Sequence, residues 1–217
     1  MRIRHFHPRH QDFRRLAAGA LLFALVLLGL SCVRKVEARV RDGDIIFQTS
    51  QSEQSQAIQI ATHSPFSHMG LVLFKDGRPF VLEAVRPSVR FTPLREWIAR
   101  GEKARFVVKR LRDASVLADP NGPSSLMKAA SEFSGKPYDP YFEWSDDRIY
   151  CSELVWKAYE RGLGVHLGLL LPLVSFDLTS PVVKAKLAER YGDKVPLDER
   201  VISPASIFNS PLLQEVP

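Results

Sequence analysis

The sequence contains little cysteine and no recognisable set of metal ligands. Its 217 residues include two cysteines and six histidines, and neither a His-x-x-x-His nor a Cys-x-x-Cys spacing occurs. One cysteine with scattered histidines falls short of the ligand set that a zinc ion takes in proteins. We therefore expect no metal site.

Internal repeats and low-complexity stretches are also missing from the sequence. Apolar residues make up 45% of the chain and charged residues 25%, which is typical of a globular protein that buries a core. The length fits one folded domain once an N-terminal targeting segment is set aside. We predict that residues 42–217 form this domain and that residues 33–41 are a basic connector.

The predicted domain has no excess of positive charge, although the whole chain carries +6. Residues 1–15 carry +4 and residues 31–41 carry +3, which leaves −1 for residues 42–217. The basic character therefore belongs to the N-terminal region and supplies no surface for a phosphate backbone. We expect no nucleic acid partner.

The only long apolar run, residues 16–30, is too short for a secure membrane span. As a helix it would reach about 22 Å, whereas a bilayer core is about 30 Å thick. Behind a basic arm, such a run favours a signal peptide over residues 1–32 and export across the inner membrane to the periplasm; an uncleaved membrane anchor is the alternative. Residues 28–32 also resemble a lipoprotein processing site at Cys32, although Gly29 stands where that pattern has leucine.

The strands are predicted between residues 44 and 111, with helices around and after them. The predicted strands are residues 44–47, 69–74, 79–85 and 104–111, with a hairpin turn at Asp76-Gly77. The predicted helices are residues 50–63, 92–100 (Thr92 as N-cap), 123–133, 151–161, 181–191 and 204–208. This order favours an α+β fold, in which an antiparallel sheet packs against helices on one side.

A cysteine, Cys151, opens the predicted helix at residues 151–161. A thiolate at a helix N-terminus is stabilised by the helix dipole and by unpaired backbone N–H groups. If Cys32 is removed, lipidated or held in the membrane, Cys151 has no disulfide partner in the chain, and such a free thiol indicates reactivity. A buried, inert cysteine is the alternative. The helix start and the polar neighbours Ser152 and Glu153 favour the reactive cysteine.

A histidine, His68, enters the predicted strand that begins at residue 69. An imidazole can take the proton of a thiol and later give it to a leaving group, and a third polar residue usually holds it in one tautomer. Glu83 is the candidate, because counting from the hairpin turn brings it near His68 across the ladder. An exposed strand charge is the alternative for Glu83. His63 and His166 are interpreted as structural.

The backbone N–H of Cys151 is the predicted donor to a tetrahedral oxyanion. Tyr150 or Tyr138 is the candidate for a second polar group there. For Tyr150, a plain core aromatic is an equally good interpretation.

Five segments, in this order along the chain, resemble the YiiX/YebB-like branch of the NlpC/P60 superfamily. They are Asp42-Gly-Asp-Ile-Ile-Phe47, Phe66-Ser-His-Met-Gly70, Leu82-Glu-Ala84, Gly135-Lys-Pro-Tyr-Asp139 and Tyr150-Cys-Ser-Glu-Leu-Val155. In that branch the papain-like fold is circularly permuted, so that the histidine strand precedes the cysteine helix. The resemblance covers roughly residues 40–210.

The resemblance implies Cys151 as nucleophile, His68 as base and Glu83 as the residue that orients it. It also implies a cysteine peptidase, amidase or acyltransferase without a cofactor, whose substrate is a cell-wall peptide or a lipid-linked amide or ester. A non-catalytic module that holds a lipid or a peptide on the same fold is the competing function.

Overall fold

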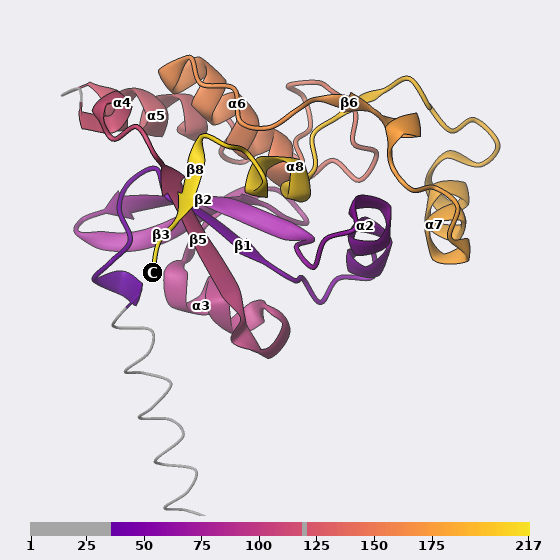
Figure 1. Cartoon of the computed structure of the whole chain (residues 1–217), viewed down its shortest axis with the longest axis horizontal. Coiled ribbons are helices and arrows are strands. Elements are labelled where there is room, and N and C mark those ends of the chain that lie inside the picture. The colour runs from indigo at the N-terminus through magenta and orange to yellow at the C-terminus, as the bar shows by residue number, and fades with distance from the viewer. Residues whose placement is uncertain (1–35, 119–120) are drawn as a thin grey trace, which may run out of the picture. The chain divides into compact units, whose positions relative to one another are not determined.

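The computed structural model describes residues 36–118 and 121–217, and a six-stranded antiparallel sheet lies at its centre (Figure 1). Across the sheet the order is β4 (Val89–Pro93), β3 (Arg78–Ala84), β2 (His68–Lys75), β1 (Ile45–Gln48), β5 (Phe106–Leu111) and β8 (Leu213–Glu215). A separate pair joins β6 (Leu171–Pro172) to β7 (Arg200–Val201). The predicted α+β class with an antiparallel sheet is therefore confirmed.

The hairpin of β2 and β3 turns at Asp76 and Gly77, as predicted. Both residues have positive φ angles, 50° and 71°, as a tight two-residue hairpin turn requires. The register pairs Leu71 with Leu82, so that the next residue, Glu83, lies beside Gly70. A Cβ at Gly70 would lie 2.4 Å from a methyl group of Val81, so only glycine fits here. Gly70 is two residues after His68, the first residue of β2. The hairpin therefore places Glu83 close to His68.

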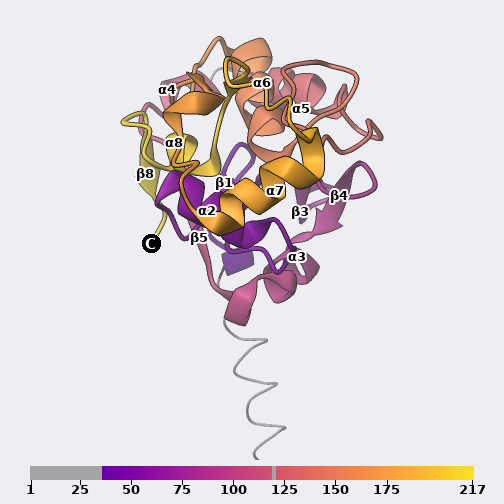
Figure 2. The same ribbon diagram turned by 90° about the vertical axis from the view of Figure 1, so that its right-hand side faces the viewer.

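One face of the sheet is covered by α6 (Cys151–Leu163), with α5 (Gly122–Ser131) packed beside it (Figures 1 and 2). The buried side chains of α6 recur at the helical period and form one stripe. They share a core with residues of β1, β2 and β3; its members include Ile45, Phe47, Met69, Leu71, Leu82, Leu154, Val155, Ala158 and Tyr159. Burying one such aliphatic side chain contributes about 1.5–3 kcal/mol.

The second face of the sheet is covered by α3 (Leu94–Arg100), whereas helices were expected on one side only. Leu94, Trp97 and Ile98 of this helix are buried. The helix begins after Pro93, and Thr92 belongs to β4, so the prediction of Thr92 as N-cap was wrong. Alternating burial is weak in so short an edge strand, which is why the sequence did not reveal β4.

The remaining elements are short and pack around the sheet and its covering helices. They are α2 (Ser55–Thr62), η1 (Glu102–Ala104), α4 (Ser115–Ala118), η2 (Leu173–Ser175), α7 (Pro181–Tyr191) and α8 (Pro204–Phe208). Figure 2 shows α2 and α7 side by side, and the two helices pack against each other. The bounds of α7 and α8 match the prediction, whereas α2 starts five residues later than predicted, after a turn at residues 52–54.

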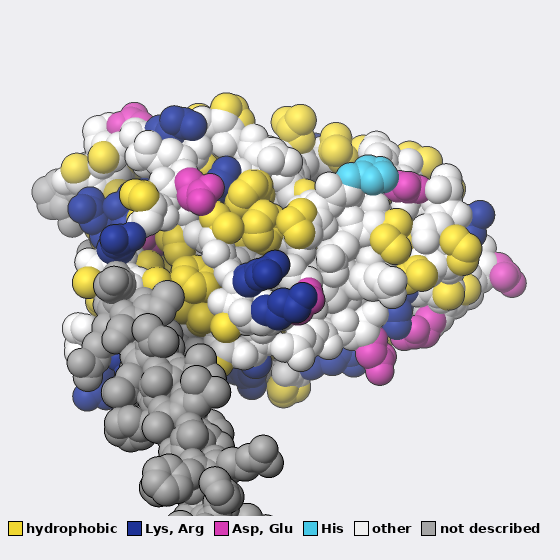
Figure 3. Space-filling model, turned by 60° about the horizontal axis from the view of Figure 1, so that its bottom comes forward, with side chains coloured by type: hydrophobic (Ala, Val, Ile, Leu, Met, Phe, Trp, Pro, Cys, Tyr) yellow, Lys and Arg dark blue, Asp and Glu magenta, His cyan; other side chains and the backbone are white. Residues whose placement is uncertain are grey.

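The N-terminal predictions cannot be followed in this structure. The signal or anchor segment 1–32, with the apolar run and Cys32, lies outside the described residues. Among residues 36–118 and 121–217, no helix is both long and apolar enough to cross a membrane. On the face drawn in Figure 3, lysine, arginine and carboxylate side chains are interspersed with apolar ones, in keeping with the near-neutral charge of residues 42–217.

Candidate active site

The cysteine that opens α6 lies at the first helical position, as predicted. Tyr150 is the N-cap in extended conformation, and its carbonyl accepts the first helical hydrogen bond from Leu154 N at 3.0 Å. The Glu153 carboxylate reaches back to accept from Tyr150 N at 3.4 Å, which completes a capping interaction. The backbone N–H of Cys151 belongs to the first turn, where amides have no acceptor within the helix. Cys151 is 7% exposed and is a free thiol.

The imidazole of His68 connects this cysteine to Glu83. Nε2 of His68 lies 2.7 Å from Oε2 of Glu83, and Cys151 lies close enough to the ring to affect its charge. Burial by itself would lower the pKa of His68, but the nearby Cys151 and Glu83 side chains outweigh it and raise the pKa to about 9. The structure thus joins His68 to Glu83 by a hydrogen bond and places Cys151 beside the ring, and at neutral pH this pKa favours the protonated imidazole.

The carboxylate of Glu83 is fully buried, and both of its oxygens accept hydrogen bonds. It accepts hydrogen bonds from His68, from Oγ1 of Thr92 at 2.6 Å and from the guanidinium of Arg100 at 2.5 and 2.7 Å. Burial favours the neutral acid, but the hydrogen bond and charge of His68, followed by Thr92 and Arg100, lower the pKa of Glu83 to about 2. Glu83 is thus a permanent anion at neutral pH, and the alternative of an exposed strand charge is wrong.

Sequence reasoning missed the residues that support Glu83. Thr92 was predicted as a helix cap and Arg100 as the end of the same helix. Trp97 of the same helix stacks on His68 with the ring centres 5.8 Å apart and 25° between the planes. Thr92 comes from the edge strand β4, and Trp97 and Arg100 come from α3. No local sequence pattern indicated that α3 lies over the second face of the sheet.

The two tyrosines predicted near the oxyanion have different surroundings. Tyr150 is 1% exposed, and its hydroxyl accepts a hydrogen bond from Ile202 N at 3.1 Å. Tyr138 is half-buried, and its hydroxyl accepts from Nε2 of Gln54 at 2.5 Å. Gln54 in turn accepts from the guanidinium of Arg190 on α7. Both tyrosines line the space beside Cys151, Tyr150 as a packed core residue and Tyr138 as part of a polar chain.

An apolar pocket opens at Cys151 between α2, α7 and the start of α6. It contains about 730 Å³ of empty space, a figure that includes the solvent at its open mouth. The lining residues are mostly aliphatic or aromatic and include Ala57, Ile58, Ala61, Phe142, Leu173, Phe176, Leu178, Val183, Leu187 and Ile202.

The other two histidines among the described residues, His63 and His166, make their contacts elsewhere. His63 ends α2 in left-handed conformation, and its ring lies 3.5 Å from the carboxylate of Asp177. His166 stacks on Trp156 with the ring centres 5.2 Å apart. In the part of the chain that the structure describes, no three His, Cys, Asp or Glu side chains are grouped so that they could hold a metal ion.

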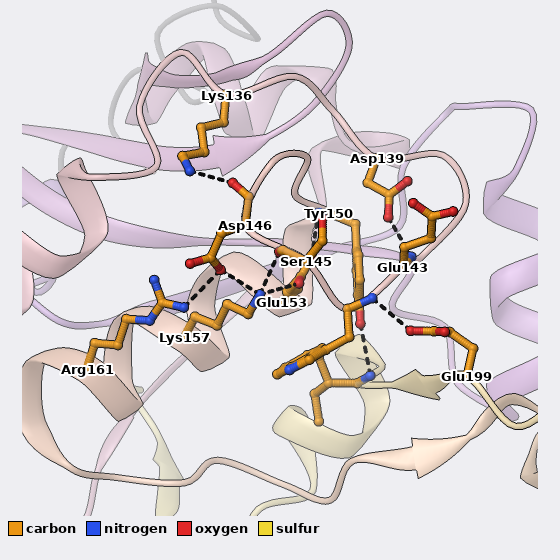
Figure 4. A network of polar contacts seen from close by, with 12 residues as sticks. Lys136, Asp139, Glu143, Ser145, Asp146, Tyr150, Glu153, Lys157, Arg161 and Glu199 are labelled. Atoms are coloured by element: carbon orange, nitrogen blue, oxygen red, sulfur yellow. Dashed lines mark hydrogen bonds and ion pairs between the residues drawn. The ribbon is translucent and has the colours of Figure 1, made fainter.

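A second polar network lies behind the nucleophile helix and ties it to the loop at residues 136–149 (Figure 4). The ammonium of Lys157 donates to Glu153 at 2.7 Å, to Asp146 at 2.9 Å and to the carbonyl of Ser145 at 2.6 Å. Arg161 also binds Asp146, at 2.8 Å. Burial dominates over the hydrogen bond from Lys157 and raises the pKa of Glu153 to about 8.

The class of protein follows from a comparison with known families. A family model described as "Permuted papain-like amidase enzyme, YaeF/YiiX, C92 family" matches residues 39–217, and the chain belongs to this family. Its members are named as amidases, which supports a cysteine hydrolase in general.

Individual relatives agree with this family. The chain is 48% identical over 193 residues to the uncharacterized protein YiiX of Escherichia coli strain K12, covering 88% of this chain and 94% of that protein. It also matches the crystal structure of metalloprotein yiiX from Escherichia coli O157:H7, with a TM-score of 0.79, 47% identity and coverage of 82% and 97% of the two chains. The permuted papain-like fold that the resemblance implied is confirmed.

Proposed function

We propose that the protein is an envelope cysteine hydrolase that cleaves an amide or ester bond of an acylated, lipid-derived substrate. The observation that carries this proposal is that Cys151, which lines an apolar pocket, lies beside the ring of His68, which is hydrogen-bonded to the buried Glu83. A cell-wall peptide without an acyl chain would leave that pocket unused. A module that only binds its ligand would have no need of an imidazolium held between a thiol and a buried carboxylate.

In the proposed mechanism, the thiol proton of Cys151 is held by His68, and the sulfur attacks the carbonyl carbon of the substrate. The oxyanion accepts a hydrogen bond from the backbone N–H of Cys151. Collapse breaks the bond to the leaving amine or alcohol, which takes its proton from His68, and an acyl thioester remains. Water then gives a proton to His68 and attacks the thioester, which releases the acid and restores the thiol.

Glu83 acts through His68 in this mechanism. Its buried carboxylate orients the ring and stabilises the imidazolium, while Arg100 and Thr92 fix the carboxylate itself. If an amine or alcohol of a second substrate replaced water in the last step, the same site would act as an acyltransferase. We regard the hydrolase as the basic activity because no further group is needed for it.

The apolar pocket would hold the acyl chain. Each methylene group removed from water contributes about 0.8 kcal/mol, so chain length should strongly affect KM. Such substrates occur in membranes, which agrees with the export and membrane attachment that the N-terminal segment predicts.

A trapping experiment tests the proposed function. The full-length protein is incubated with a dodecanoyl ester or amide, quenched in acid and digested, and the peptide containing Cys151 is analysed by mass spectrometry. We expect an acyl thioester on Cys151, and neither adduct nor product with the Cys151→Ala variant. Cleavage of an acyl-free cell-wall peptide at an equal or higher rate would contradict the assignment of an acylated substrate.

A further inference from the structure

A second, polar pocket lies next to the apolar one, and His68 is among the residues that line it. It is lined by residues from the end of β1 to the start of α2, from the loop after β3 and from α7. Gln54, Tyr138, Lys186 and Arg190 line both pockets, so the two spaces share one border. Cys151 lines the apolar pocket and His68 the polar one. A substrate cleaved here therefore meets two different environments on either side of the bond.

The charges around the polar pocket are mostly positive. The cationic side chains that line it are Arg86, Arg100, Lys186 and Arg190, besides His68, and the acidic ones are Glu53 and Glu189. This excess of cations contrasts with the −1 carried by residues 42–217 as a whole. A concave site with one sign of charge concentrates ligands of the opposite sign.

Two of these cations are not already paired with a carboxylate. Arg100 is occupied by Glu83 at 2.5 Å, and Lys186 by Glu189 at 2.5 Å. Within residues 36–118 and 121–217, Arg86 and Arg190 form no salt bridge. Arg190 instead donates to the neutral amide oxygen of Gln54.

Arg190 lies at the border between the pockets, and Arg86 lines the polar pocket near that border. The guanidinium carbon of Arg86 is 6.0 Å from the centre of the Tyr138 ring, and Tyr138 is linked through Gln54 to Arg190. The pKa of Glu189 is lowered first by its hydrogen bond with Lys186 and further by the charges of Lys186, Arg190 and Arg86. Guanidinium groups bind carboxylates and phosphates in bidentate geometry.

We propose that the polar pocket is a head-group site for the anionic leaving group of the substrate, a phosphate or a carboxylate held between Arg86 and Arg190. This inference rests on the proposed function, because it places the acyl chain in the apolar pocket and the scissile bond at the border, beside Cys151. The substrate class is then an acidic amphiphile with an amide or ester between its acyl chain and its head group.

Two matched pairs of substrates test this site with the full-length protein. N-dodecanoylphosphoethanolamine is compared with N-dodecanoylethanolamine, and N-dodecanoylglutamate with N-dodecanoylglutamine amide. We expect kcat/KM to be at least about 10-fold higher for the acidic member of one pair or of both, mainly through KM. A preference in the first pair alone identifies a phosphate head group, and in the second pair alone a carboxylate. Equal or reversed values in both pairs would overturn the inference.

Three charge-removing variants connect the preference to the pocket. In Arg86→Gln and Arg190→Gln, the ratio of acidic to neutral kcat/KM should fall by at least about 5-fold, and Arg190→Lys should restore part of it. Arg78→Gln removes the same charge from the exposed hairpin turn, outside both pockets, and should keep the wild-type ratio. Because each ratio is measured within one protein, a partly misfolded variant lowers both values alike. Unchanged ratios in both pocket variants would exclude these arginines.

A binding measurement separates this inference from the proposed function. Cys151→Ala protein is titrated with N-dodecanoylphosphoethanolamine and N-dodecanoylethanolamine below their aggregation limits. Tighter binding of the phosphate compound supports the head-group site even if the wild-type protein hydrolyses neither. Equal binding overturns the site even if both are hydrolysed.

Discussion

Two glutamates of this protein, Glu83 and Glu153, are both fully buried, yet their environments favour opposite charge states. Burial opposes ionisation of each, but the donors around Glu83 lower its pKa to about 2, whereas the pKa of Glu153 rises to about 8. Glu83 has three donating side chains, while Glu153 has the Lys157 ammonium and a long contact to Tyr150 N. The number and geometry of donors, not burial, decide which carboxylate is an anion.

We infer different roles for the two glutamates. Glu83 holds the charge that His68 needs, so it belongs to the chemistry. Glu153 caps the nucleophile helix and, through Lys157, fixes the loop at residues 136–149, so it belongs to the support. The following predictions test this division, from the largest expected effect to the smallest.

Replacing each glutamate by glutamine should separate chemistry from support. Glu83→Gln should lower kcat about 10²–10⁴-fold, because the imidazolium loses its counter-charge and its fixed orientation. Glu153→Gln keeps a hydrogen-bonding cap and should lower kcat less than about 10-fold. Steady-state kinetics on a dodecanoyl ester measure both. Equal losses of kcat in the two variants would contradict the separate roles of Glu83 and Glu153.

The same two groups should give opposite trends of stability with pH. With its pKa lowered to about 2, Glu83 contributes stability above its ordinary value of 4.5, and this contribution is lost as the pH falls from 4.5 to 2. With its pKa raised to about 8, Glu153 contributes fully below 4.5, and this contribution is lost as the pH rises from 4.5 to 8.

Denaturant unfolding at a series of pH values measures these trends. Glu153→Gln should remove part of the alkaline decline, on the order of 2 kcal/mol. His68, with its pKa raised to about 9, loses its own contribution between 6.5 and 9, so His68→Gln serves as the control for that window. A Glu153→Gln curve parallel to the wild type between pH 4.5 and 8 would show that Glu153 is ionised throughout.

Reaction of the thiol with iodoacetamide tests the role of His68 directly. His68→Gln should slow alkylation of Cys151 about 10–100-fold at pH 7, because the base that takes the thiol proton is gone. Lys157→Met, which disturbs only the support network, should leave the rate within about 3-fold. Alkylation rates that do not depend on His68 would contradict the proposed pair.

Arg100, which binds Glu83, should matter more for activity than Arg161, which binds Asp146 in the network around Glu153. Arg100→Gln leaves Glu83 with two of its three donor side chains and should lower kcat about 10-fold, with a loss of about 1–2 kcal/mol of stability for a half-exposed partner. Arg161→Gln removes only an exposed contact to Asp146 and should change kcat less than about 2-fold. Kinetics and thermal unfolding compare them, and an Arg100→Gln variant with wild-type kcat and stability would mean that Glu83 does not depend on Arg100.

The smallest effect is expected at Tyr150. Tyr150→Phe removes the acceptor of Ile202 N and should cost about 0.5–1.5 kcal/mol of stability, with kcat nearly unchanged. A loss of kcat beyond about 10-fold would instead support the predicted oxyanion role. Tyr138→Phe, measured alongside, tests the same role for the tyrosine that lies at the border of the pockets.

Local patterns were sufficient for the parts of the site that depend on neighbours in sequence. Asp76-Gly77 fixed the hairpin and hence the approach of Glu83 to His68. Gly164 in left-handed conformation ends the helix that Cys151 begins. These features follow from φ angles, capping and the two-residue period of strands, all of which are written in short segments.

The pocket walls could not be predicted in this way. Gln54 and Arg190 are 136 positions apart and meet only because α2 packs against α7. Arg100 reaches Glu83 because α3 crosses the second face of the sheet, which no local period specifies. The burial that sets the charge of Glu83 and Glu153 is likewise a product of packing.

The sequence by itself determined the cysteine at a helix start, the histidine strand, the hairpin register and the family, because each depends on short-range geometry or on ordered motifs. Only the tertiary structure decided which donors surround each carboxylate, and that an apolar and a polar pocket share a border at Gln54, Tyr138, Lys186 and Arg190. Electrostatic environment depends on distances between elements far apart in the chain, and those distances exist only after the sheet and its helices have packed.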